Sequence, residues 1–233
     1  ENKNKNITDS IHYAKRIQDA MLPTVDMFKS HIPNSFILFK PKDIVSGDFY
    51  WVKETDSKCF VAVVDCTGHG VPGAFMSIIG IELLRNITEV EAVEDTAEVL
   101  NRLSASVHET FSSVSYPNES GLKVKDGMDV TFCTFDKQYD IMQFTGAFSD
   151  LYIIRDGNII EVKGDRFSVG MADDAGRYMF SSSYIPLMPD DMIYLFTDGY
   201  VDQFGGPEGK KFKFRRFRRL LLNIYRLPLE TQQ

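Results

Sequence analysis

The sequence predicts an α+β protein or a layered sandwich, in which helices are segregated from antiparallel sheets. Three observations lead to this class. The apolar pattern changes along the chain from strands to helices and back to strands, short turns link consecutive strands, and no βαβ unit repeats. With 233 residues, of which 43% are hydrophobic and 25% charged, the chain is long enough to bury one sizeable core.

The N-terminal segment has a helical pattern that ends at Pro23. Apolar residues recur at spacings of four, three, three and four: Ile7, Ile11, Ala14, Ile17 and Met21. Two interpretations are open: the helix packs on its own domain, or it is the end of a coiled coil from an upstream sensor domain. Since the chain begins at Glu1, we expect residues 1–22 to be a linker helix in a longer protein, with homodimerisation through residues 7–21.

The later elements follow from apolar patterns with turn residues between them. We expect strands at 36–39, 49–52 and 60–64, helices at 72–87 and 94–112, a polar loop at 115–127, and strands at 129–135, 139–145, 150–155, 158–163 and 192–197. The tripeptide Asp156-Gly157-Asn158 is typical of a hairpin turn between two of these strands.

Composition excludes several classes of protein. No run approaches the roughly 20 apolar residues that cross a bilayer, so no membrane association of this fragment is expected. No signal-peptide pattern opens the chain. Cys59, Cys66 and Cys133 are odd in number and widely spaced, which argues against a disulfide framework or a zinc site and predicts a cytoplasmic location.

Charge is distributed unevenly along the chain. Residues 210–233 carry +7 of a total net charge of −7, so residues 1–209 carry −14. An acidic body is typical of carboxylates gathered for a metal, and equally of a merely soluble surface. The basic tail is either a nucleic-acid-binding patch or a packed amphipathic helix. Near-helical spacing of its apolar residues favours the helix, so no nucleic-acid partner is expected: Phe212, Phe217, Leu220, Leu221 and Ile224.

Three aspartates stand at the ends of apolar runs, two of them beside glycine: Asp48, Asp65 and Asp198. A carboxylate at a strand end can project into a cleft, and glycine lets a ligand or backbone approach closely. Mg²⁺ and Mn²⁺ prefer such oxygen ligands. Each Asp-Gly pair alone is also ordinary turn chemistry, but three such positions together favour a metal site.

The run from Gly68 to Pro72 opens the helix expected at 72–87. Glycine-rich backbone at a helix N-terminus can receive an anion such as phosphate. The run lacks the Lys-Ser/Thr ending of a Walker loop, and the chain carries no nucleophilic triad signature.

Four runs together resemble the metal-dependent Ser/Thr protein phosphatases of the type 2C superfamily, and most closely their bacterial SpoIIE/RsbU branch: SGDFYW, VVDCTGHGVPGAFMS, GMDVTFCTFD and LFTDGYVDQFGGPEGKKF. The resemblance covers residues 34–225 with the motifs in the right order. It implies a layered α-β-β-α sandwich of two antiparallel sheets flanked by helices, with two Mn²⁺ or Mg²⁺ ions at one end. Residues 23–233 would form this type 2C phosphatase domain.

The resemblance also implies roles for individual residues. Asp65 bridges the two ions, and the carbonyl of Cys66 binds one of them. Asp198 binds the first ion, and Asp48 supports the second ion directly or through water. A water shared by two cations loses a proton near neutral pH and attacks phosphorus, so the protein needs no nucleophile of its own.

Two further roles have ordinary structural alternatives. Asp126 or Asp129 helps to hold a looser third ion, or lies in a surface turn. His69 protonates the leaving serine oxygen, or is a structural residue at the start of a helix. Three departures from the family pattern are Gly146-Ala147-Phe148, where many relatives have a Gly-His-Asn-type turn, the lack of an Arg at the phosphate-binding position of eukaryotic members, which this branch commonly lacks, and the lack of an Asp-Asp motif before the chain stops. The last departure leads us to expect a C-terminally truncated domain or a degenerate member.

The function implied is hydrolysis of phosphoserine or phosphothreonine on a partner protein in bacterial signalling and sigma-factor regulation. The expected substrate is a phosphorylated STAS-type anti-sigma-factor antagonist, with an upstream sensor domain as the source of the signal. The alternative is a non-catalytic pseudophosphatase that binds the same partners. The missing terminal motif favours this alternative, whereas the intact Asp48, Asp65 and Asp198 oppose it.

Overall fold

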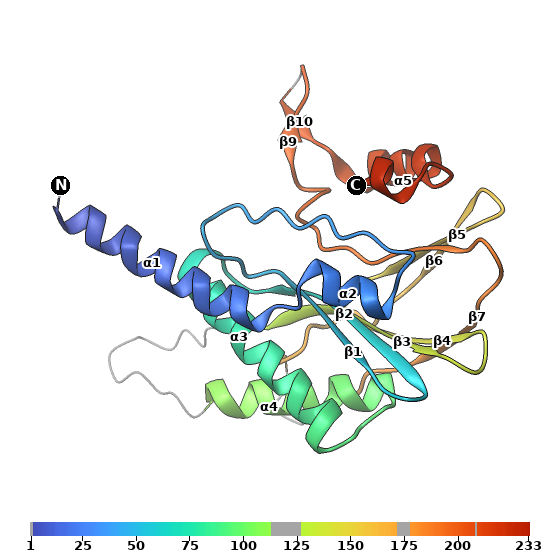
Figure 1. Cartoon of the computed structure of the whole chain (residues 1–233), viewed down its shortest axis with the longest axis horizontal. Coiled ribbons are helices and arrows are strands. Elements are labelled where there is room, and N and C mark those ends of the chain that lie inside the picture. The colour runs from blue at the N-terminus through green and yellow to red at the C-terminus, as the bar shows by residue number, and fades with distance from the viewer. Residues whose placement is uncertain (1, 113–126, 172–177, 208) are drawn as a thin grey trace.

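The computed structural model describes residues 2–112, 127–171, 178–207 and 209–233 (Figure 1). Its helices are α1 (Asn2–Met21), α2 (Val25–His31), α3 (Gly70–Arg85) with a π-helical extension η1 (Asn86–Val90), α4 (Thr96–Ser112), α5 (Lys213–Ile224) and α6 (Leu229–Gln232). Its strands are β1 (Phe49–Glu54), β2 (Lys58–Cys66), β3 (Met128–Asp136), β4 (Ile141–Ala147), β5 (Leu151–Arg155), β6 (Asn158–Val162), β7 (Ser183–Pro186), β8 (Met192–Tyr194), β9 (Phe204–Gly205) and β10 (Lys210–Lys211).

Two antiparallel sheets form the centre of the molecule. One has five strands in the order β1-β2-β3-β4-β7, and the other has three in the order β6-β5-β8. The longest ladder joins β2 to β3, from Lys58 opposite Asp136 to Cys66 opposite Met128. A separate two-stranded ribbon of β9 and β10 projects from the body (Figure 1).

Side-chain alternation along the strands divides the structure into four layers. Phe132 of β3 packs with α3 and α4, whereas the next residue, Cys133, lies in the core between the two sheets. On β5, Ile153 faces that same inter-sheet core and Ile154 packs against α5. Figure 1 accordingly shows α4 and α5 on opposite sides of the sheets. The predicted α-β-β-α sandwich is therefore confirmed.

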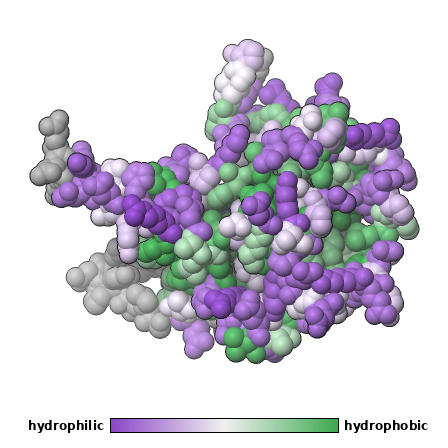
Figure 2. Space-filling view, viewed as in Figure 1, coloured by the Kyte–Doolittle hydropathy of each residue, from purple (hydrophilic) through white to green (hydrophobic). Residues whose placement is uncertain are grey.

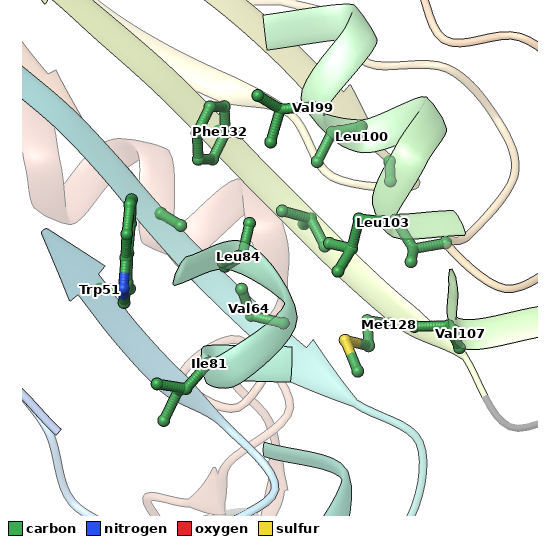
Figure 3. Packing of buried hydrophobic residues seen from close by; sticks show 14 of the residues in the cluster. Trp51, Val64, Ile81, Leu84, Val99, Leu100, Leu103, Val107, Met128 and Phe132 are labelled. Atoms are coloured by element: carbon green, nitrogen blue, oxygen red, sulfur yellow. The ribbon is translucent and has the colours of Figure 1, made fainter. Parts of the chain in front are cut away.

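The largest core lies between the five-stranded sheet and the helices α3 and α4 (Figure 3). One face of α4 is fully buried because its apolar residues recur at helical spacing: Val99, Leu100, Leu103 and Val107. Leu84 of α3 packs in the same cluster as this face of α4 and as Phe132 and Val64 of the sheet. Each such side chain contributes roughly 1.5–3 kcal/mol through burial, so this core fixes α3, whose first turn borders the acidic end of the sheet.

The prediction of a strand at 36–39 is wrong, because these residues form no hydrogen-bonded ladder with another strand. Their apolar character is explained by side-chain burial instead: Phe36 packs beneath α5, and Ile37 packs with Phe28 of α2 over the inner face of β1 and β2. The pattern also did not predict α2 or β7. The strand expected at 192–197 ends at Tyr194, where the chain leaves the sheet.

The remaining expected elements are found with shifts of a few residues at their ends. The strand expected at 139–145 occupies 141–147, and the helix expected at 72–87 begins at Gly70. The basic tail forms α5, whose Phe217 and Leu221 are buried against the three-stranded sheet. The polar loop expected at 115–127 lies outside the described residues except for Gly127.

Helix α1 packs on α3 near its C-terminal end and projects away from the body at its N-terminal end (Figure 1). Met21 contacts the main core, whereas Ile7 is 52% exposed and Ile17 is 45% exposed. The projecting part carries mainly hydrophilic residues in the view of Figure 2. Within the described ranges, no helix is long and apolar enough to cross a membrane.

Candidate metal centre

Three separate segments bring aspartates together at one end of the five-stranded sheet. Asp48 directly precedes β1, Asp65 is the penultimate residue of β2, and Asp198 lies four residues beyond the end of β8. Asp65 is directly opposite Asp129 of β3, and opposed residues of antiparallel strands project from the same face. Asp65, Asp129 and Asp198 line a cavity of about 270 Å³.

The carboxyl groups lie close enough to interact strongly. Asp65 is within hydrogen-bonding range of both Asp48 and Asp198. Burial, together with the negative charges of Asp48 and Asp198, raises the pKa of Asp65 to about 8. Burial and the neighbouring Asp202 raise the pKa of Asp198, and burial raises that of Asp129 despite a hydrogen bond from Ser168. Ionisation of Asp65 beside the other carboxylates is therefore unfavourable, and a proton or a cation relieves the repulsion.

Hydrogen bonds and close backbone packing hold the segments around these aspartates. The Thr197 hydroxyl donates to Asp48 Oδ2 at 2.7 Å and so ties the segment after β8 to the turn before β1. A Cβ on Gly47 would meet the carbonyl oxygens of Gly68 at 2.7 Å and Cys66 at 3.2 Å, and a Cβ on Gly73 would meet that of Gly68 at 2.5 Å. Any larger residue at Gly47 or Gly73 would separate the Asp48 turn from the end of β2.

A buried glutamine that the sequence pattern did not single out fixes the same turn from α1. The Gln18 amide donates to the Ser46 carbonyl at 2.6 Å and to the Ser77 hydroxyl at 2.8 Å, and its oxygen accepts from the Ser46 N–H at 3.0 Å. Gln18 is fully buried, and these three bonds satisfy it. The C-terminal end of α1 is therefore bonded both to α3 and to the loop that carries Asp48.

The donor set fits a hard divalent cation, although it is not a closed cage. Among the residues that the structure describes, no three His, Cys, Asp or Glu side chains form a ready ligand group for a metal ion. Mg²⁺ and related ions, however, use one or two carboxylates and keep several waters. The available donors are carboxylate and backbone oxygens, and the Cys66 thiol is buried in the core. The mutual repulsion of Asp48, Asp65 and Asp198 makes a cation at this position favourable.

Other residues singled out in the sequence lie in different surroundings. His69 precedes the first turn of α3, its side chain is 82% exposed, and its Nδ1 lies 3.1 Å from Asp43 Oδ2. It is not among the described residues that line the cavity. Asp126 lies outside the described residues. Phe148, in the turn that departs from the family pattern, lines the cavity with a φ of 51°.

Sequence reasoning missed three residues of the cavity wall, which are Ser149, Asp150 and Arg166. Ser149, Asp150 and Arg166 line the cavity beside Phe148. No local motif marks them, because they come together only when the segment after β6 pairs with the ends of β3 and β4. The one local trace of this packing in the sequence is the presence of glycine at positions 146 and 164. A Cβ on Gly146 or Gly164 would lie about 2 Å from the Ser149 carbonyl oxygen, so no larger residue fits there.

We expect the substitution Asp65→Asn to stabilise the metal-free protein at pH 8 but not at pH 4. The raised pKa means that unfolded Asp65 ionises near its ordinary pKa of about 4, whereas the folded protein resists ionisation up to about pH 8. The free energy of unfolding of the wild type therefore falls as the pH rises from about 4 to about 8, by an amount on the order of 2–5 kcal/mol. Urea denaturation with a chelator present measures this difference.

The matched control for this experiment is Asp56→Asn, at an exposed turn between β1 and β2. It should change stability little at either pH. Equal unfolding free energies for wild type and Asp65→Asn at pH 8 would show that Asp65 carries no electrostatic penalty.

Comparison with known proteins identifies the family of the chain. The family described as stage II sporulation protein E (SpoIIE) matches residues 55–232. The solved SiaA-PP2C domain of Pseudomonas aeruginosa is 34% identical with a TM-score of 0.84, and the similarity covers 99% of this chain and 87% of that one. No curated protein matches the sequence.

Two more distant structures share the fold. The RsbU and RsbW domains of a Mycobacterium tuberculosis protein are 20% identical with a TM-score of 0.61, covering 83% of this chain and 50% of that one. The PP2C phosphatase domain of SpoIIE from Bacillus subtilis, with a fragment of its regulatory domain, is 19% identical with a TM-score of 0.58, covering 77% and 48%. The chain belongs to the SpoIIE family of PP2C-type phosphatase domains.

Proposed function

We propose that this domain is a metal-dependent protein phosphatase that hydrolyses phosphoserine or phosphothreonine on a partner protein. The observation that carries the proposal is the group formed by the half-buried Asp48 and Asp65 and the more exposed Asp198 at the cavity, in a chain 34% identical to the SiaA-PP2C domain. Their repulsion is relieved by cations, and no protein nucleophile is needed when cations activate water.

Different residues at this site would bind each of two Mn²⁺ or Mg²⁺ ions. Asp65 would bridge both ions, Asp198 and the Cys66 carbonyl would bind the first, and Asp48 would support the second. When bound, the ions supply activation of a water molecule for in-line attack and neutralisation of phosphoryl charge. The Thr197 hydroxyl donates to Oδ2 of Asp48, so Oδ1 would be the oxygen available as a ligand. His69 does not line the cavity, so we assign no proton transfer to it.

For the partner, we propose a phosphorylated STAS-type anti-sigma-factor antagonist, with an upstream sensor domain supplying the signal. Membership of the SpoIIE family supports this assignment. We place the reaction in the cytoplasm, which the three unpaired, buried cysteines Cys59, Cys66 and Cys133 support.

A non-catalytic pseudophosphatase is the second candidate. It is favoured by one observation, namely that no three acidic, His or Cys side chains among the described residues form a closed ligand group. The two candidates differ in one measurable property. An enzyme hydrolyses a phosphoserine peptide when Mn²⁺ is added, whereas a pseudophosphatase binds the phosphorylated partner without turnover.

We expect Asp65→Asn to lower kcat/KM for Mn²⁺-dependent hydrolysis of a phosphoserine peptide by about 100-fold or more, because a bridging carboxylate serves both ions. Asp198→Asn should behave similarly, and Asp48→Asn should have a smaller effect. Asp56→Asn is the control and should match the wild type. Wild-type turnover in the Asp65→Asn variant would contradict the proposed role of Asp65.

We also propose that α1 mediates homodimerisation through residues 7–21. The exposed Ile7 and Ile17 support this proposal, because apolar side chains on a projecting helix gain from burial in a partner. The double variant Ile7→Asp/Ile17→Asp should sediment as a monomer at concentrations where the wild type is dimeric. The control Val90→Asp alters a 76%-exposed apolar residue outside α1 and should remain dimeric. A dimer of unchanged mass in the double variant would refute the assignment.

A further inference from the structure

The wall of the acidic cavity includes one basic side chain among the described residues, that of Arg166. The described residues that line the cavity include four carboxylates, Asp65, Asp129, Asp150 and Asp198, and a single basic residue, Arg166. A phosphoryl group carries negative charge and is repelled by such a wall. Among the described residues of the cavity wall, Arg166 is therefore the basic residue available to an anion that enters the cavity.

The backbone around Arg166 is fixed at both ends. On its N-terminal side, the Asp165 N–H donates to the Gly146 carbonyl at 2.8 Å, and the Asp165 carbonyl accepts from the Phe148 N–H at 2.8 Å. On its C-terminal side, Val169 and Met128 exchange two backbone hydrogen bonds of 2.9 and 3.1 Å. These bonds hold the Arg166 segment across the ends of β3 and β4, beside the aspartates.

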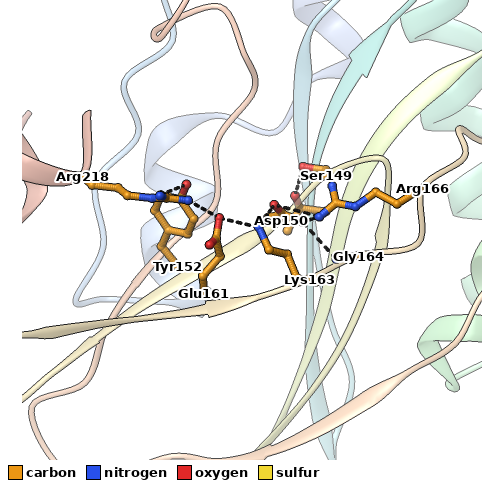
Figure 4. Close-up of polar contacts among 9 residues, drawn as sticks. Ser149, Asp150, Tyr152, Glu161, Lys163, Gly164, Arg166 and Arg218 are labelled. Atoms are coloured by element: carbon orange, nitrogen blue, oxygen red, sulfur yellow. Dashed lines mark hydrogen bonds and ion pairs between the residues drawn. The ribbon is translucent and has the colours of Figure 1, made fainter. Parts of the chain in front are cut away.

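The Arg166 side chain has one ion-pair partner among the described residues, Asp150 (Figure 4). Arg166 Nη2 lies 3.1 Å from Asp150 Oδ1, and Asp150 also accepts from Lys163 at 3.0 Å and from the Gly164 N–H at 3.1 Å. Asp150 is therefore shared among three donors. The Arg166 side chain is 56% exposed, and its contacts with described residues use Nη2 alone. Asp150 thus holds one corner of the guanidinium of Arg166, a residue that lines the cavity.

We propose that Arg166 binds two oxygens of the substrate's phosphoryl group and so positions it against the carboxylate site. This inference rests on the proposed function. The guanidinium presents parallel N–H donors that match two phosphoryl oxygens, a geometry that a lysine ammonium does not reproduce. Asp150 acts through Arg166 as a positioning residue.

Lys163 provides a matched control. It pairs with the same Asp150 and also with Glu161 at 2.7 Å, and its side chain is 54% exposed, similar to that of Arg166. Figure 4 shows it between Asp150 and Glu161, and it is not among the described residues that line the cavity. Removing Lys163 therefore removes a cation from the same network without removing one from the cavity wall.

The test is calorimetric titration of inorganic phosphate into the Mn²⁺-loaded wild type and the variants Arg166→Met, Arg166→Lys and Lys163→Met. Loss of a charge-assisted bidentate contact should weaken phosphate binding about tenfold or more in Arg166→Met. Arg166→Lys keeps the charge next to Asp150 and should recover only part of the affinity. Lys163→Met should bind phosphate within about twofold of the wild type, and all variants should bind Mn²⁺ equally.

Hydrolysis of a phosphoserine peptide gives an independent readout, in which Arg166→Met should raise KM. Wild-type phosphate affinity in Arg166→Met, equal weakening in Lys163→Met, or no phosphate binding by the wild type would each overturn the inference. If wild type binds phosphate through Arg166 but turns over no phosphopeptide, the proposed function fails while this inference stands.

Discussion

Like-charge repulsion among Asp48, Asp65 and Asp198 is the constraint on which this end of the molecule depends. Burial of Asp65, together with the negative charges of Asp48 and Asp198, raises the pKa of Asp65 to about 8. A fold selected for stability alone would separate such groups. Here they are kept together by the sheet and by packed backbone, which is the arrangement expected where electrostatic strain is offset by a bound cation.

The surrounding architecture keeps the carboxylates from moving apart. The β2–β3 ladder places Asp65 opposite Asp129, the contacts of Gly47 and Gly73 with the Gly68 carbonyl fix the turn before β1, and Gln18 bonds that turn to α1 and α3. The main core then fixes α3, through residues such as Leu84, relative to the sheet. A helix outside the sandwich is therefore joined by buried hydrogen bonds to the loop that carries Asp48.

Apolar periodicity and the position of Asp48, Asp65 and Asp198 at the ends of apolar runs are local signals, so the sequence was sufficient to predict an α+β fold and to single out these three aspartates. The four layers were implied by the resemblance to the phosphatase family. It was not sufficient to predict the segment at 36–39, where Phe36 and Ile37 are buried by different layers without strand pairing. Nor did it reveal Gln18 or Arg166. The partners of Gln18 lie 28 and 59 residues away, and Arg166 reaches the cavity through backbone pairing with β3 and β4. Such long-range placement leaves no periodic trace in the chain.

Calorimetric titration of Mn²⁺ into the metal-free wild type and Asp65→Asn tests whether the aspartate group is a divalent-cation site. We expect two ions per chain for the wild type. We expect the binding of both ions to be weakened together in the variant, because Asp65 is the carboxylate proposed to serve both. Equal Mn²⁺ affinity and stoichiometry in the two proteins would show that the aspartate group is not the cation site.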